Sequence, residues 1–171
     1  MTALELQNGL LDAWKKNELA TSFLIRNLPP EIWELVIPGT QRKTVGSMCA
    51  HLHNARCMWV KMLGTGYKIK VPPLVNARKC GPEELLEALP ISGTGIKSLI
   101  SKAIENGKLK DAAWQNFQTD PFHILSYFVA HEAHHRGQLC LVARQLGHKL
   151  PKEVTSGLWQ WKKLQRMDAT D

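Results

Sequence analysis

Hydrophobic residues recur three and four positions apart along most of the chain, the spacing that places them on one face of an α-helix. Few segments alternate with the two-residue period of a β-strand. The pattern predicts four long helices, from about Thr2 to Arg26, from Thr44 to Leu63, from about Pro82 to Gly107 and from Asp120 to Leu146, with short helical turns near residues 31–35 and 156–164.

Residues that begin and end helices support these boundaries. Thr44 and Asp120 are good N-terminal caps, and Pro121 suits the first position of a helix. We expect an interruption of the third helix between Pro90 and Gly95, because proline inside a helix removes a hydrogen bond. Residues 64–80 are predicted to form a long loop, of a kind that is often functional or covers a site.

Four amphipathic helices joined by loops favour an all-α fold, and the simplest architecture is an antiparallel four-helix bundle with short extra helices. The length of 171 residues is close to that of one domain, so a single domain over residues 1–171 is expected.

The composition points to a soluble protein of the cytoplasm. Hydrophobic residues make up 44% and charged residues 22%, which is typical of globular chains. There is no apolar run long enough to span a membrane and no secretory signal, and the four cysteines show no C-x-x-C spacing. The net charge of +7 comes from scattered basic residues, so neither a nucleic-acid partner nor a membrane partner is expected.

The chemistry of the chain is concentrated in its histidines. His131 and His135 are four residues apart on the fourth predicted helix, so their side chains share one face and can reach the same metal ion. That face also carries Ile124, Phe128 and Val142, which directs it toward the bundle core. Buried ring nitrogens need partners, and a metal ion would satisfy two of them at once.

A third ligand is expected from the second predicted helix, where His51 and His53 compete. His51 lies on an apolar line, whereas His53 lies on a mixed line with Arg56, so His51 is the better candidate. A single core histidine is most often a hydrogen-bonded packing residue, but three on facing apolar stripes are better explained by a metal. Three ligands leave a coordination position open, as in catalytic sites.

The same stretch permits a competing interpretation. His131-Glu132-Ala133-His134-His135 matches H-E-x-x-H, the zinc-protease pattern in which Glu is the general base. The extended pattern fails after His135, where Gln138 stands in place of glycine. Within a bundle, Glu132 is expected to pair with Arg136, and Gly137 is expected at a close approach of a neighbouring helix. The roles of His134 and Gln138 stay open.

Together, Thr44-Val45-Gly46 with His51-Leu52 and the stretch from His131 to Gln138 resemble the DinB family, also called the DinB/YfiT-like metalloproteins. The resemblance implies an up-down-down-up bundle whose His51, His131 and His135 bind zinc, nickel or a similar divalent ion. It also implies a homodimer.

Some members of that family are S-transferases or isomerases that use a low-molecular-weight thiol. The resulting hypothesis is a metal-dependent thiol S-transferase acting on a small-molecule substrate, with Lys68 and Lys70 as candidates for holding an acidic thiol. Two alternatives remain: a non-enzymatic metal-binding bundle of the stress response, and a metal-dependent hydrolase that uses the H-E-A-H-H stretch.

Overall fold

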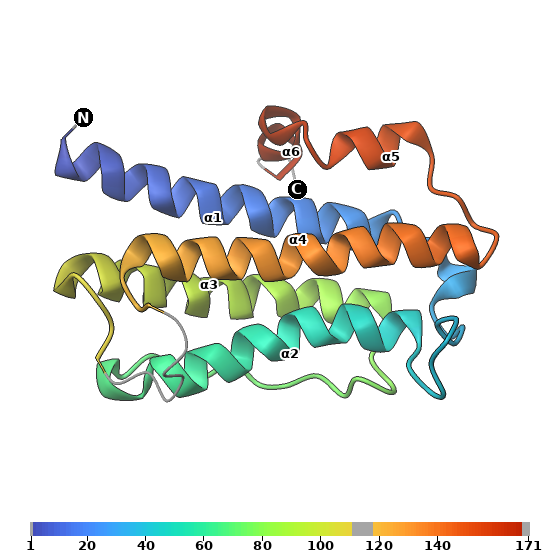
Figure 1. The fold of residues 1–171 in the computed structure, drawn as a ribbon, viewed down its shortest axis with the longest axis horizontal. Coiled ribbons are helices and arrows are strands. Elements are labelled where there is room, and N and C mark those ends of the chain that lie inside the picture. Colours follow the sequence, from blue (N-terminus) through green and yellow to red (C-terminus); the bar gives the residue numbers. More distant parts are fainter. Residues whose placement is uncertain (1, 111–117, 169–171) are drawn as a thin grey trace.

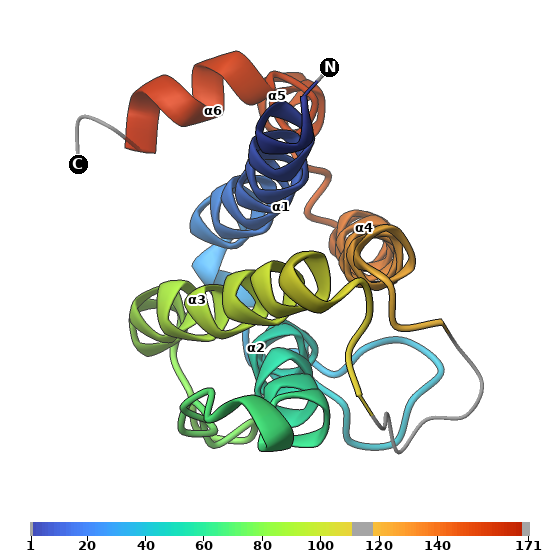
Figure 2. The same cartoon turned by 90° about the vertical axis from the view of Figure 1, so that its left-hand side faces the viewer.

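Four long helices lie side by side in the computed structural model, which describes residues 2–110 and 118–168 (Figures 1 and 2). α1 and α4 run in one direction and α2 and α3 run in the other, an up-down-down-up arrangement (Figure 1). The bounds are α1 (Ala3–Arg26), α2 (Val45–Leu63), α3 (Pro82–Asn106) and α4 (Pro121–Gln145). The predicted all-α four-helix bundle is confirmed.

Local capping explains where the helices begin. The Thr2 hydroxyl accepts a hydrogen bond from the Glu5 amide while the Glu5 carboxylate accepts one from the Thr2 amide, a reciprocal capping box. Thr44 caps α2 by accepting from the Ser47 amide at 3.1 Å. Asp120 caps α4, with Pro121 at the first helical position. Each predicted start is confirmed because a cap acts within its own turn of the helix.

The predicted interruption of α3 was wrong, because the helix continues through Pro90. A proline inside a helix costs about 3 kcal/mol. Leu85 and Leu89 before it, and Ile96 and Leu99 after it, are all 0% exposed and continue a single buried stripe. Burying each such side chain contributes roughly 1.5–3 kcal/mol, so packing outweighs the local cost.

The last helix, predicted at residues 156–164, is two helices in the structure, α5 (Lys152–Gly157) and α6 (Trp161–Asp168). A Cβ on Gly157 would lie 2.8 Å from the Phe23 ring, so α5 ends in close contact with α1. Leu164 of α6 packs against Leu19 of α1 in a separate small cluster. The chain turns between the two helices so that both can contact α1.

The segment after α2 begins with a 3-10 helix, η2 (Thr65–Tyr67), and then runs beside α2 and α3. Asn54 exchanges two 3.0 Å hydrogen bonds with the backbone of Val75. The His53 ring donates to the Pro73 carbonyl oxygen at 2.9 Å and lies 3.0 Å from the Ser92 hydroxyl. The long loop therefore covers the junction of α2 with α3. A second 3-10 helix, η1 (Pro30–Ile32), follows α1 where a short turn was expected.

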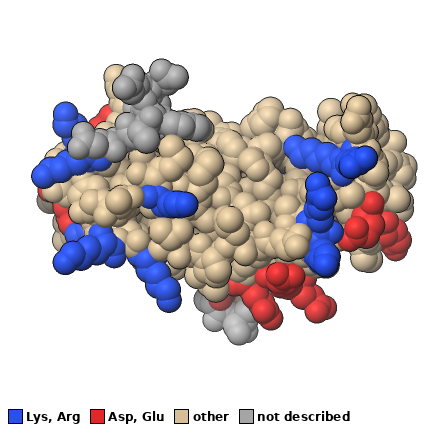
Figure 3. All heavy atoms as spheres, turned by 90° about the horizontal axis from the view of Figure 1, so that it is seen from below, with Lys and Arg blue, Asp and Glu red and all other residues tan. Residues whose placement is uncertain are grey.

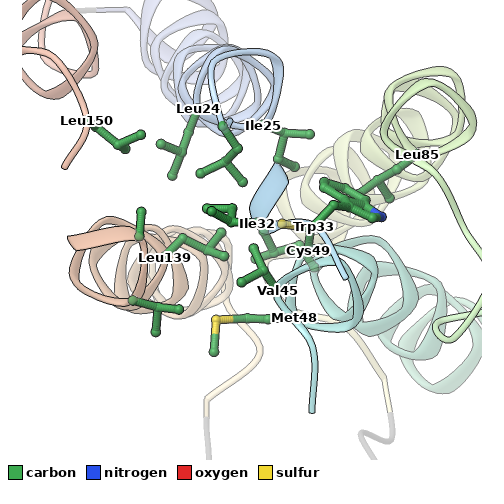
Figure 4. Close-up of a cluster of buried hydrophobic side chains, with 14 of the residues drawn as sticks. Leu24, Ile25, Ile32, Trp33, Val45, Met48, Cys49, Leu85, Leu139 and Leu150 are labelled. Atoms are coloured by element: carbon green, nitrogen blue, oxygen red, sulfur yellow. The ribbon is translucent and has the colours of Figure 1, made fainter. Parts of the chain in front are cut away.

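The apolar core has two parts. One cluster joins the C-terminal half of α1, η1, the first turns of α2 and α3, and the last turns of α4 (Figure 4). The other cluster centres on Trp14, Trp59 and Phe128, whose rings pack edge-on or tilted. Between the two, α1, α2 and α4 each place polar residues in the interior: Asn17, Thr21, Arg56 and Glu132.

On the face formed by α2 and the loop that follows it, lysine and arginine gather toward the two ends, with a largely uncharged band between them (Figure 3). None of the described helices combines the length and the apolarity needed to cross a bilayer. Cys49, Cys57, Cys80 and Cys140 are all free thiols.

Candidate metal centre

Two helices bring the three predicted histidines together. The capped start of α4 places His131 and His135 on successive turns of one face, with ring centroids 4.6 Å apart. His51 of α2 faces them, with its ring centroid 5.4 Å from that of His131 and 4.8 Å from that of His135. The candidate ligand atoms all lie within 4.8 Å of one another.

These distances fit one shared ion. Bonds of about 2.0–2.1 Å from each nitrogen require the ligand atoms to lie within roughly 4 Å of one another. The candidate ligand atoms, which lie within 4.8 Å of one another, would therefore have to approach slightly on binding. Three imidazoles suit zinc, nickel, copper and iron, so the donor set fits a divalent transition metal.

The hydrogen bonds of the rings leave nitrogens available for a metal. His135 Nδ1 lies 2.8 Å from Gln138 Oε1, and because an amide oxygen only accepts, Nδ1 carries the proton and Nε2 keeps its lone pair. His131 Nδ1 is buried and has no hydrogen-bond partner among the described residues. An unpartnered buried nitrogen is costly, and coordination to an ion would remove that cost.

The environment keeps the three rings neutral, which is the form that binds metals. Burial, followed by the neighbouring His135 and His51, lowers the pKa of His131 to about 4. Partial burial lowers the pKa of His51 and of His135, and the Lys43 ammonium lowers both further. The Gln138 hydrogen bond acts in the opposite direction on His135 without reversing the shift.

Aromatic side chains form one wall of the centre. The Trp59 indole meets the His131 ring edge-on at a centroid distance of 4.7 Å, and the Tyr127 ring is stacked on it at 6.3 Å. His134 is exposed, with its ring 5.2 Å from that of His135. It lies outside the group of converging ligands.

His53 has a different role from His51. It is 0% exposed and contacts α3 and the loop rather than α4. The choice of His51 over His53 agrees with the geometry, but its reason was partly wrong. His51 and Met58 are exposed, whereas Met48 and Ala55 on the same line are buried, so this line runs along the edge of the core and is not wholly apolar interior.

The expectation that Glu132 pairs with Arg136 was also incomplete. Glu132 is 0% exposed and is bound chiefly by Arg56, whose Nε and Nη2 lie 2.6 and 2.9 Å from its two oxygens. Asn17 and Thr21 also donate to Glu132 Oε2. Arg136 lies further away, at 3.8 Å from the same oxygen. Burial alone would raise the pKa of Glu132, but Arg56 and these hydrogen bonds hold it below its ordinary value.

This arrangement argues against the hydrolase alternative. In that mechanism Glu132 would face a metal-bound water, whereas here its oxygens are occupied by side chains of α1 and α2. The sequence offered little sign of Arg56 as its partner, since the two residues are 76 positions apart. The only signal was an arginine placed directly between the apolar residues Ala55 and Cys57.

Another expectation was wrong. Gly137 is exposed and no atom of the described residues lies within 4 Å of a Cβ built on it, so none of the described helices explains it by close approach. Lys70 lines a cavity with residues of α3, including Ile91 and Thr94, and none of the three histidines lines this cavity. The Lys43 ammonium acts on two of the ligand histidines, His51 and His135.

Within the described part of the chain, the three histidines converge without a fourth His, Cys, Asp or Glu. Fold and site together define a helical bundle protein with a three-histidine centre able to bind a metal ion. The family model for the DinB family matches residues 4–162, and the chain belongs to this family. No curated protein matches the chain in a sequence search.

Proposed function

We propose that this protein is a metal-dependent transferase that joins a low-molecular-weight thiol to a small electrophilic molecule. The observation that carries the proposal is the convergence of His51, His131 and His135 without a fourth protein ligand among the described residues. Such a centre leaves a coordination position for a reactant, which is the mark of catalytic rather than structural sites.

A divalent ion bound there would lower the pKa of a coordinated thiol and so supply a thiolate at neutral pH. The thiol proton passes to solvent. The sulfur then forms a bond to the electrophilic carbon, and the bond from that carbon to its leaving group breaks with both electrons.

The chain's own residues would serve binding and orientation. Gln138 holds the His135 ring through Nδ1 and so leaves Nε2 free to bind an ion, and Trp59 packs edge-on against the His131 ring. The ammonium group of exposed Lys43 lowers the pKa of His51 and of His135, so its positive charge acts at the centre. The same charge would attract the carboxylate of an acidic thiol. In this proposal Lys43 takes the role first assigned to Lys68 and Lys70.

A homodimer is also proposed, as the family resemblance implies. Supporting it is an apolar hollow of about 270 Å³ beside α4, lined by Gly137, Cys140 and Leu158 and bordered by two tryptophans. Trp159 is 79% exposed and Trp161 is 46% exposed. Sedimentation of the wild-type protein beside Trp159→Ser tests this: we expect a dimer that the substitution weakens, and a monomeric wild type would refute it.

The first experiment is elemental analysis of the untagged protein beside His131→Ala, with His134→Ala as the matched control on the same helix. We expect one equivalent of metal in the wild type and in His134→Ala and none in His131→Ala. Metal-loaded protein is then assayed with several thiols and model electrophiles. Absence of metal would overturn the whole proposal, whereas metal without turnover would leave a non-enzymatic metal-binding bundle.

A further inference from the structure

The polar residues between the two apolar clusters form one connected layer across the bundle. α1 contributes Asn17 and Thr21, α2 contributes Arg56, and α4 contributes Glu132 and Arg136. At this level α3 contributes the Leu89 carbonyl oxygen, which accepts from Arg56 Nη1 at 3.0 Å. The layer lies next to the metal centre in sequence, since Glu132 follows His131 directly.

Arg56 is held on every side. Its Nε and Nη2 donate to the two oxygens of Glu132, a forked contact that fixes both distance and angle. Its guanidinium lies 5.0 Å from the centre of the Trp14 ring, and Glu18 lies 3.7 Å from Nη1. A lysine at this position would keep the charge but lose the planar fork.

This contact joins the two helices that carry the metal ligands. Arg56 is five residues beyond His51 on α2, and Glu132 is the neighbour of His131 on α4. Arg136 makes 2.8 Å hydrogen bonds to Asn17 and Thr21, so it joins α4 to α1 instead. The same layer therefore contains two contacts that can be compared. Arg56 with Glu132 joins the two ligand-bearing helices, and Arg136 joins α4 to α1 without involving α2.

We propose that Arg56 and Glu132 are positioning residues of the metal centre: their forked ion pair sets α2 against α4 so that His51 stands opposite His131 and His135. The inference rests on the proposed function in so far as the three histidines bind a metal. It assigns to the buried pair an effect on metal affinity beyond its contribution to folding.

The test compares Arg56→Lys with Arg136→Lys, two equal changes in chemistry within one buried layer. Zinc dissociation constants are measured by competition with a chromophoric chelator, at a temperature where circular dichroism shows both variants folded. We expect Arg56→Lys to weaken zinc binding by about 10-fold to 100-fold, the range typical of residues that orient metal ligands. Arg136→Lys should weaken it by less than about 3-fold. Equal affinities in the two folded variants would overturn the proposal.

A second measurement needs no metal. The parent for this measurement carries Cys140→Ser, because Cys140 is a free thiol that is not fully buried. Spin labels are placed on exposed positions of the two helices, at Met58→Cys on α2 and Leu141→Cys on α4, and their distance distribution is recorded by pulsed electron resonance. Arg56→Lys should shift or broaden this distribution, and Arg136→Lys should leave it as in the parent. If the parent binds no zinc, the proposed function fails. The positioning of α2 against α4 by Arg56 is then tested by this distance alone, and an unchanged distribution in Arg56→Lys would refute it.

Discussion

Acidification should weaken metal binding by this protein much less than it weakens binding by three ordinary imidazoles. A metal competes with protons for each ring, so the affinity falls as the ligands become protonated. The pKa of an ordinary histidine is about 6.5, whereas burial and the neighbouring rings lower the pKa of His131 to about 4.

The size of the effect follows from these values. Between about pH 7.5 and about pH 5.5 the neutral fraction of an ordinary imidazole falls roughly 10-fold, so three of them would lose about 1000-fold in affinity. His131, with its pKa near 4, stays neutral throughout. Because the pKa values of His51 and His135 are also lowered, the loss should be smaller than about 100-fold.

The lowered pKa of His131 also determines how the free energy of unfolding of the metal-free protein changes with pH. Below about pH 6.5 and above about pH 4, unfolded His131 binds a proton that the folded ring does not. The free energy of unfolding therefore falls as the pH drops through this interval. The stability that depends on a neutral His131 is fully present above about pH 6.5.

The assay is a zinc competition titration at several pH values, corrected for protonation of the competing chelator. His123→Ala serves as the control, since this exposed histidine in the first turn of α4 pairs with Asp120 and lies outside the ligand group, so its loss should leave the profile unchanged. A loss of about 1000-fold or more over the interval would show that the rings behave as solvated imidazoles, and would refute the burial argument.

Three further changes test other contacts. Gln138→Leu removes the acceptor on His135 Nδ1 and should weaken zinc binding about 10-fold to 100-fold in the same titration. His53→Ala should keep one equivalent of metal by elemental analysis but lower the free energy of unfolding in urea by about 1–3 kcal/mol, because its buried hydrogen-bond partners lose their contacts. Gly137→Ala should raise that free energy by about 0.5–1 kcal/mol, because alanine stabilises a helix and nothing lies near the added carbon.

Gly46→Ala is the matched comparison for the last change. It also lies within a helix, but its Cβ would stand 2.4 Å from Nε1 of Trp33, so it should destabilise the protein. The two substitutions must differ in sign under identical denaturation conditions. A stabilising Gly46→Ala would show that the Trp33 ring moves away freely. A folded His53→Ala protein without metal would contradict the assignment of His53 to packing rather than to the metal centre.

Local signals were enough to predict the starts of the four long helices and two of the three candidate ligands. Thr44 and Asp120 act on amides two or three residues away, so the starts of α2 and α4 follow from the chain itself. The four-residue spacing of His131 and His135 places both on one face of any helix that contains them. The continuity of α3 through Pro90 could not be predicted in this way, because it depends on side chains that pack from other helices.

The amino-acid sequence by itself determined where the four long helices begin and which histidines share a helix face, since both depend on contacts within about four residues. Only the tertiary structure decided that His51 faces α4 while His53 faces α3, and that Glu132 binds Arg56. Helical phase separates the faces of a helix but does not say which neighbour each face meets. That choice depends on how four helices pack at once, and so on pairs of residues far apart in the chain.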